Sequence, residues 1–398
     1  MPFHYWIQTS KKLTEKKEET LAKARAVRSF HEGIPAYERT PLLSLPGLAE
    51  ALGVKGIYVK DESPRFGLQA FKGLGGSYAM FRILCEELGL DPEKTSLEDL
   101  QRPDRKEAIS RLCFVTCTDG NHGRGISWAA GLFGCQAYVY MPAGSRPVRA
   151  EAIRRAGSAK VSITELNYDE TVAYASAMAE EKGWILIQDT AWEGYEKIPG
   201  WIVEGYLTMA AEAAEDLESL GVRPTHLLLQ AGVGAMAGSV LSYMAEYYRE
   251  KKPVTILVEP DTVDCHLRSC REGDGQIHSV EGSPETIMAG LNCGTPCRIT
   301  WPVIRDLAEG FLAIPDEAAA AGMRAYAAGL GNDPKIESGE SGAATLGALL
   351  SLMQEKELEE ARRSLGLGAD SQILLINTEG ATDPENYRKI VIQSVPDC

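Results

Sequence analysis

Residues 112–142 read LCFVTCTDGNHGRGISWAAGLFGCQAYVYMP, and this stretch decides the fold class. The apolar runs at 112–118 and 135–142 predict two short strands, and residues 123–134 predict the helix that joins them. Strands that alternate with helices in this way are typical of a parallel sheet covered by helices on both faces. The stretch therefore predicts an α/β fold.

The same alternation continues along the chain in two series. Further helices are predicted at 146–157, around 169–182, at 200–220 and at 235–250, and further strands at 159–164, 184–191, 225–232, 254–261 and 371–380. We therefore expect two open, twisted, mostly parallel sheets flanked by helices. Residues 1–77 and 196–398 would form a large domain, into which residues 78–195 are inserted as a small α/β domain.

Composition and charge narrow the class of protein. The chain has 398 residues, which fits two domains, and 44% of them are hydrophobic and 24% charged. The formal net charge of −15 argues against binding nucleic acid or an anionic membrane surface. The sequence contains neither a signal-peptide-like start nor an apolar run long enough to cross a membrane. We expect a cytoplasmic protein that acts on a small molecule.

Lys72 lies in GLQAFKGLGGSYAM, residues 67–80, where a helix is expected to begin. A lysine is the side chain that forms a Schiff base with a carbonyl group, and partial burial frees its amine. A solvated surface lysine is the alternative. The apolar neighbour Phe71 and the glycines Gly73, Gly75 and Gly76 favour the functional interpretation, because they suggest that a ligand approaches closely.

A second glycine-rich turn, AGVGAMAGSV at 231–240, follows a predicted strand and begins a helix. Its backbone N–H groups and the helix dipole would suit a phosphate, although tight packing of helix on strand would also explain the glycines. A different class of function is also open. Gly232, Gly234 and Ala237, with Glu259 at the end of the next strand, approach the fingerprint of a nicotinamide-dependent oxidoreductase.

The turn at 118–123 forms a third candidate site. It begins the helix after the first strand, so its N–H groups could bind a second anion such as a substrate carboxylate. Asn121 is a neutral donor, and His122 could contact the substrate, although a lone histidine beside a glycine is more often structural. Asp119 places a carboxylate in this anion-binding turn, either as a cap of the helix or for catalysis.

The chain has nine cysteines, and an odd number in a long chain without a signal peptide does not suggest a framework of disulfides. Four of them cluster as Cys265, Cys270, Cys293 and Cys297, with spacings that fit a zinc site poorly. We expect no metal and mostly free thiols. A bridge between Cys265 and Cys293 is a further option that the sequence leaves open.

These motifs together carry a resemblance to a known family. The lysine in AFKGLGG, the Asn–His turn and the glycine-rich segment occur in this order in fold-type II pyridoxal 5′-phosphate enzymes, the group of tryptophan synthase β, threonine dehydratase and serine racemase. Within the group, the chain is most similar to the ammonia-lyases of 2,3-diaminopropionate. Long stretches carry this similarity, among them KDESPRFGLQAFKGLGG (60–76), QDTAWEGYEKIPGWI (188–202) and GNDPKIESGESGA (331–343).

The resemblance implies a role for each candidate residue that binds the cofactor. Lys72, with Phe71 beside it, would hold pyridoxal 5′-phosphate as a Schiff base, and Asn121 would contact the oxygen on the cofactor ring. Thr378 would place a neutral hydroxyl against the pyridine nitrogen, which makes the ring a milder electron sink. The phosphate would lie against the backbone N–H groups of Gly232, Val233, Gly234, Ala235 and Met236.

It also implies the residues that meet the substrate. Asp119 would take the α-proton of the D-isomer, as Lys72 would for the L-isomer, or pair with the second amino group. Asp189, at a predicted strand end, would recognise that amino group or assist proton transfer, unless it is only a turn residue. The substrate would be contacted by Thr118, Asp119, Gly120, His122 and Asp189.

The reaction that follows is the elimination of 2,3-diaminopropionate to pyruvate and two ammonia, catalysed by a homodimer. A serine or threonine dehydratase is the alternative nearest in chemistry, and a nicotinamide oxidoreductase is the alternative from another class. The sequence does not give the preferred enantiomer, the activity on serine or a requirement for a monovalent cation.

Overall fold

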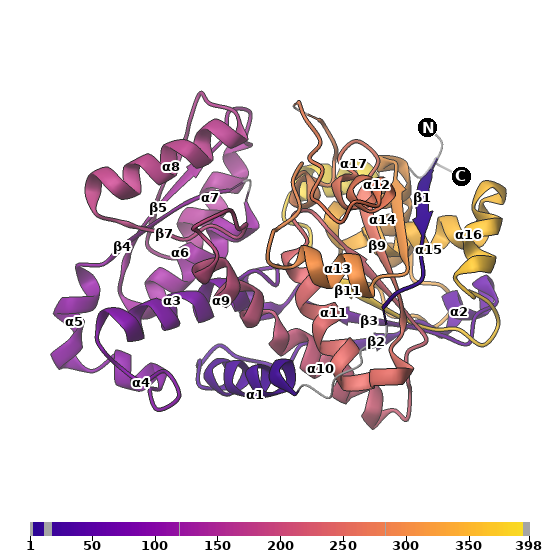
Figure 1. The fold of residues 1–398 in the computed structure, drawn as a ribbon, viewed down its shortest axis with the longest axis horizontal. Helices are drawn as coiled ribbons and strands as arrows, with labels where there is room; N and C mark the ends of the chain where they lie inside the picture. Colours follow the sequence, from indigo (N-terminus) through magenta and orange to yellow (C-terminus); the bar gives the residue numbers. More distant parts are fainter. Residues whose placement is uncertain (1–2, 12–17, 119, 283, 393–398) are drawn as a thin grey trace. The chain divides into compact units, whose positions relative to one another are not determined.

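A computed structural model describes residues 3–11, 18–118, 120–282 and 284–392 (Figure 1). The chain divides into two compact units. Unit 1 contains Met1–Leu21, Arg39–Pro64 and Met209–Cys398, and unit 2 contains Ala22–Glu38 and Arg65–Thr208. The contact pattern therefore divides the chain at Pro64 and Thr208, whereas the sequence suggested limits at 77 and 195. The assignment of residues 78–195 as an inserted domain stays a prediction.

Unit 2 is built on a four-stranded parallel sheet. Its strands are β4 (Cys113–Cys117), β5 (Gln136–Met141), β6 (Ala159–Ile163) and β7 (Ile185–Leu186), in the order β6-β5-β4-β7. Every residue of β4 is buried, as expected for a central strand covered on both faces. The helices of this unit are α3 (Gly73–Glu87), α4 (Leu97–Leu100), α5 (Pro103–Ser110), α6 (Asn121–Phe133), α7 (Pro147–Ala156), α8 (Tyr168–Lys182) and α9 (Lys197–Gly205), besides most of α1 (Glu19–Glu32).

Unit 1 is built on a seven-stranded sheet in the order β1-β10-β9-β8-β11-β3-β2. The strands are β1 (His4–Ile7), β2 (Leu42–Ser44), β3 (Gly56–Asp61), β8 (His226–Gln230), β9 (Val254–Pro260), β10 (Gly310–Ile314) and β11 (Gln372–Asn377). The five inner strands are parallel, and the two edge strands pair antiparallel. The main helices are α2 (Pro46–Leu52), α10 (Leu207–Ser219), α11 (Ala235–Tyr248), α12 (Cys265–Glu272), α13 (Trp301–Leu307), α14 (Asp316–Ala328), α15 (Glu340–Gln354), α16 (Glu359–Ser364) and α17 (Pro384–Val391).

The predicted α/β class with two mostly parallel sheets is confirmed, with two local corrections. The strand expected at 184–191 contains only Ile185 and Leu186, because the Tyr195 hydroxyl binds the backbone of residues 186 and 188 in place of a neighbouring strand. The helix expected at 200–220 is two helices that meet at Tyr206, whose N–H bonds back to Val203 in a tightened last turn.

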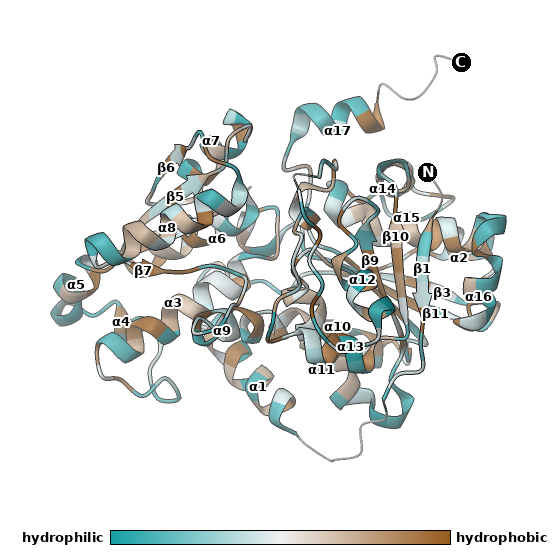
Figure 2. Cartoon of the chain, turned by 45° about the horizontal axis from the view of Figure 1, so that its top comes forward, coloured by the Kyte–Doolittle hydropathy of each residue, from teal (hydrophilic) through white to brown (hydrophobic). Residues whose placement is uncertain are grey.

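Apolar residues gather on the inner strands, whereas α5 and α17 are largely hydrophilic in Figure 2. In the described ranges, no helix combines the length and the apolar character that crossing a membrane requires.

Candidate active site

Lys72 occupies the N-cap position of α3, and its side chain is only 19% exposed. An ammonium group at the positive end of a helix dipole is electrostatically unfavourable by about 0.3–1 kcal/mol. The carboxylate of Asp189 offsets this cost through a short, direct ion pair with Lys72 Nζ. A residue type that local electrostatics disfavours, held by a buried counter-charge, is typical of a functional position.

The glycines after Lys72 serve close packing, and the interpretation that they admit a ligand stays a prediction. A Cβ on Gly75 would lie 2.7 Å from the Tyr206 ring, and a Cβ on Gly76 would lie 3.0 Å from the Ile126 side chain. A Cβ on Gly125 in α6 would lie 3.0 Å from the backbone of Lys72. The missing side chains therefore let α6 and α9 approach α3 and fix the position of Lys72.

Asp189 stands in a turn that neighbouring side chains hold in place. The N–H of Gln188 donates to the Tyr195 hydroxyl at 2.8 Å, and that hydroxyl donates to the Leu186 carbonyl at 3.0 Å. The Gln188 side-chain oxygen accepts from Thr116 Oγ1 at 2.9 Å. Tyr195 and Gln188 thus position Asp189, a role that the sequence analysis did not assign to them. The sequence signal for it was the cluster of polar residues around Gln188 and Asp189.

His122 completes a buried group of three titratable side chains in unit 2. Its Nε2 lies 2.9 Å from the Ile187 carbonyl and must carry the proton, while Nδ1 lies 3.8 Å from Asp189 Oδ2 and has no hydrogen-bond partner. Burial lowers the pKa of His122, so the ring is neutral at pH 7.

Burial opposes the charged form of Asp189, but the nearby positive charges more than offset it and hold the pKa of this carboxyl well below its usual range. Because His122 is neutral at pH 7, the ammonium of Lys72 is the partner that keeps Asp189 ionised there. The structure thus brings Lys72, Asp189 and His122 together.

Neutral buried histidines predict a loss of stability in mild acid. Burial lowers the pKa of both His122 and His226, so below the unfolded value of about 6.5 the unfolded chain takes up protons that the folded chain does not. The free energy of unfolding should therefore fall between about pH 7 and pH 5.5, by up to about 1.4 kcal/mol per pH unit for each histidine. The unfolding free energy can be measured by urea denaturation at several pH values for the wild type and for His226→Gln. It should fall less steeply with falling pH in the variant than in the wild type. An equal dependence on pH in both proteins would contradict the prediction.

The turn before α6 is ordered by Thr118, whose Oγ1 accepts from the N–H groups of Gly120 at 3.0 Å and Gly123 at 3.3 Å. Asn121 is the first residue of α6. Asp119 lies outside the described residues, so its predicted role stays a prediction. The Phe71 ring is buried against Tyr206, with centroids 4.8 Å apart.

A second group of predicted site residues lies in unit 1 at the N-terminus of α11. Gly234 is the N-cap residue with φ +83°, and no side chain caps the helix. The first N–H groups of a helix have no partner within it, so those after Gly234 are available to an anion. Close packing also explains the glycines at 232 and 238. A Cβ on Gly232 would lie 3.1 Å from the backbone of Gly290, and a Cβ on Gly238 would lie 2.5 Å from the Thr300 side chain.

Thr378 follows β11 and is held by Gln230, the last residue of β8. The Gln230 amide Nε2 donates to Thr378 Oγ1 at 3.2 Å and to the carbonyls of Ser341 and Ile376 at 3.0 Å each. Because Thr378 Oγ1 is the acceptor in this hydrogen bond, the hydroxyl proton of Thr378 can be donated to another group. Sequence reasoning missed Gln230, although a lone amide in the apolar run THLLLQAG was a visible signal.

Glu259 does not serve as a ribose acid. It is fully buried, and its two carboxylate oxygens accept from the N–H groups of His266 at 2.8 Å and Leu267 at 2.9 Å. Because this carboxylate is used to cap α12, the nicotinamide interpretation loses its key residue. The Cys265 thiol faces the Cys293 carbonyl at 3.5 Å, and both cysteines are free thiols.

Substitution of Gly234 should separate packing at the α11 N-terminus from general backbone strain. In Gly234→Ala, a Cβ would lie 2.4 Å from His266 Nε2 in a left-handed conformation, so we expect a loss of about 2–4 kcal/mol in unfolding free energy. Gly221→Ala is the matched control, because its φ is +66° but no atom lies within 4 Å, and it should lose only about 1 kcal/mol. Denaturation curves that show equal losses would contradict this assignment.

A model of the family described as pyridoxal-phosphate dependent enzyme matches residues 34–370. The chain therefore belongs to this family, whose cofactor is pyridoxal 5′-phosphate. It is 48% identical over 371 residues to diaminopropionate ammonia-lyase from Escherichia coli K12, covering 93% of this chain and 91% of that enzyme. It is 50% identical over 367 residues to the Salmonella typhimurium enzyme of the same name, covering 92% and 91%. Within its family, the chain belongs to the diaminopropionate ammonia-lyases.

A solved structure extends this similarity to three dimensions. The Escherichia coli enzyme in complex with an aminoacrylate-PLP azomethine reaction intermediate superposes with a TM-score of 0.90 at 44% identity, covering 98% of this chain and 97% of that one. Each unit by itself contains groups that are compatible with the cofactor of the family. In unit 1, α11 has an uncapped N-terminus and Thr378 has a hydroxyl proton that its contact with Gln230 does not use, and in unit 2, Lys72 is a partly buried amine.

Proposed function

We propose that this chain is a pyridoxal-phosphate dependent ammonia-lyase that converts 2,3-diaminopropionate, as the D-isomer, the L-isomer or both, and one water molecule to pyruvate and two ammonia. The observation that carries the proposal is the partly buried Lys72–Asp189 ion pair with His122 beside it. The high identity to the two diaminopropionate ammonia-lyases supports the choice of substrate.

When bound, pyridoxal phosphate supplies the electron sink that makes the substrate α-proton acidic. Lys72 would hold the cofactor covalently and then act as the base that removes the α-proton of the L-isomer. The backbone N–H groups from Gly232 to Met236 would hold the phosphate. The Thr378 hydroxyl, which already accepts from Gln230, would donate its proton to the ring nitrogen and keep that nitrogen unprotonated.

Two carboxylates, those of Asp189 and Asp119, would interact with the substrate. Asp189 is ionised and buried, so it can recognise the cationic second amino group and keep it in place until the β-carbon–nitrogen bond breaks. The proposal for Asp119, which rests on the sequence alone, is that it removes the α-proton of the D-isomer. Asn121 would contact the cofactor ring, and Thr118, Gly120 and His122 would line the substrate site.

We also propose that the enzyme works as a homodimer in the cytoplasm. The free thiols among the described cysteines suit a reducing compartment. Twofold dimers are the commonest assembly of enzymes that form oligomers.

A pyruvate assay on purified protein with both isomers of diaminopropionate, and with D- and L-serine, tests the function. We expect turnover of at least one diaminopropionate isomer well above that of either serine. Equal or faster turnover of serine would favour a dehydratase, and no pyruvate from any of the four would refute the proposal. Full D-isomer turnover in Asp119→Asn would contradict the proposed role of Asp119.

A further inference from the structure

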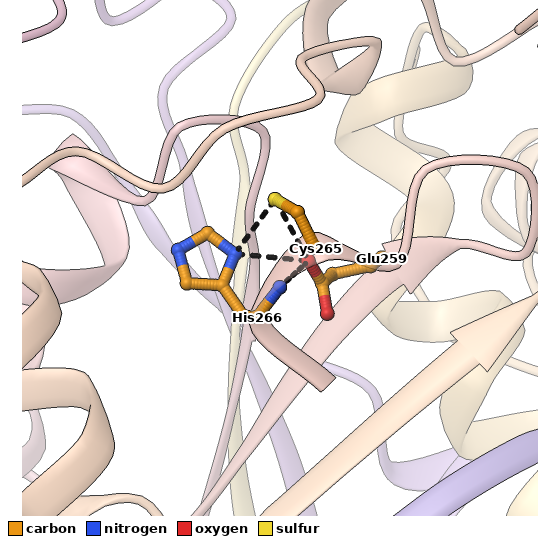
Figure 3. Close-up of side chains that lie close together, drawn as sticks. All are labelled: Glu259, Cys265 and His266. Carbon is orange, nitrogen blue, oxygen red and sulfur yellow. Dashed lines mark hydrogen bonds and ion pairs between the residues drawn. The ribbon is translucent and has the colours of Figure 1, made fainter. Parts of the chain in front are cut away.

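Glu259 and His266 form a buried pair of side chains, with Cys265 beside them (Figure 3). Glu259 is the last residue but one of β9, His266 lies in the first turn of α12, and both are fully buried. The Glu259 carboxylate accepts from His266 Nδ1 at 2.9 Å. Neither side chain has a part in the reaction steps described above, so the pair needs another explanation.

The contacts assign the proton on one ring nitrogen. A carboxylate oxygen that also accepts a backbone N–H at 2.8 Å can only accept, so His266 Nδ1 carries a proton. His266 Nε2 is buried and has no hydrogen-bond partner. The other titratable group that faces the ring is the Cys265 thiol, 3.6 Å from Nδ1, and the remaining aromatic neighbour is Trp301.

The unpartnered nitrogen packs against the glycine that begins α11, on a side that Ile304 also occupies. A Cβ built on Gly234 would lie 2.4 Å from His266 Nε2, which places this nitrogen against the N-cap residue of α11. An uncapped helix N-terminus and a buried, unpartnered ring nitrogen thus meet at one glycine. An unsatisfied buried polar atom costs about 1–3 kcal/mol, a cost that a ligand bound there would remove.

We propose that His266 binds the phosphate of the cofactor as an imidazolium, with Nε2–H donating to a phosphate oxygen and Glu259 holding the ring through Nδ1–H. The pair adds a positive charge to the dipole of α11, opposite a phosphate dianion. The inference rests on the proposed function, because it takes the α11 turn as the phosphate site.

Glu259, Cys265 and His266 also bring three ligand atoms within 4.8 Å of one another, a spacing open to a metal ion. The Glu259 oxygens already accept three N–H groups, so hydrogen bonding accounts for the cluster without an ion. A metal at this position would use Nδ1 as ligand and displace its proton, which the experiment below detects.

The test compares pyridoxal phosphate with pyridoxal, which lacks the phosphate. Apoprotein is titrated with each compound by visible absorbance, for the wild type and for His266→Gln. The matched control is His226→Gln, since His226 is a buried histidine of the same unit whose nitrogens both have partners, at 2.8 Å and 2.9 Å. We expect His266→Gln to weaken pyridoxal phosphate binding about 10- to 100-fold, with pyridoxal unchanged, and the control to alter neither.

A second readout uses wild-type holoenzyme and so does not depend on folding of a variant. Nitrogen-15 NMR of labelled histidine rings should show one imidazolium with both nitrogens protonated at pH 8, absent from His266→Gln. A neutral His266 ring, a metal-bound Nδ1, or an unchanged affinity ratio between the two compounds would overturn the inference. Failure of the wild type to bind either compound would instead refute the proposed function.

Discussion

Lys72→Ala should lose at least about 1,000-fold in the rate of pyruvate formation from diaminopropionate, the largest effect expected of any single substitution. The variant lacks both the amine that attaches the cofactor and the base that takes the α-proton of the L-isomer. The measurement is kcat for each isomer at saturating cofactor. Lys182→Ala is the matched control, because Lys182 lies in the same unit and pairs with Glu181 on the surface.

The variant also leaves Asp189 as a buried carboxylate without its counter-charge, so its folding must be checked. Removing one partner of a buried ion pair costs about 3–5 kcal/mol in unfolding free energy. Because the Lys72–Asp189 pair is partly exposed, we expect a loss at the lower end of this range. Circular dichroism with a melting curve separates the two effects. A folded Lys72→Ala protein that kept more than a tenth of the wild-type rate would contradict the proposed role of the lysine.

Asp189→Asn is the second substitution with a large expected effect. The amide keeps the shape of the side chain but removes the charge that pairs with Lys72 and, as proposed, with the second amino group of the substrate. We expect kcat for diaminopropionate to fall about 100- to 10,000-fold. Asp104→Asn, at a surface pair with Arg102 in the same unit, should have no effect.

The substrate comparison separates the two roles of Asp189. Serine has a hydroxyl where diaminopropionate has its second amino group. If Asp189 recognises that amino group, the loss for diaminopropionate should exceed the loss for D-serine by about tenfold or more. Equal losses on both substrates would show that the carboxylate acts only through Lys72, and unaltered kinetics would refute both roles.

The fold could be predicted from periodicity because most of its central strands are short apolar runs between helices. β4 and the helix after it were predicted to within two residues. The prediction failed where a tertiary contact overrides local sequence: Tyr195 shortens β7, and the close approach of α9 to α3 depends on glycines whose neighbours lie far away in the chain.

For the candidate site, the sequence pointed to the titratable residues but not to the residues that hold them in position. Lys72, Asp189 and His122 stand in recognisable motifs, and the structure brings these three together. Gln230 and His266 were not among the predicted site residues, since their importance depends on which atoms their nitrogens meet in the fold. The alternative role of Glu259 as a ribose acid stayed open in the sequence, because spacing along the chain does not show that its oxygens cap α12.

The most direct test of the account is reduction of the purified protein with borohydride, followed by mass spectrometry of its peptides. We predict a visible absorption band that reduction abolishes, with the cofactor left attached to the peptide that contains Lys72. Attachment to any other lysine, or a protein that stays colourless after incubation with pyridoxal phosphate, would contradict the claim that Lys72 holds the cofactor.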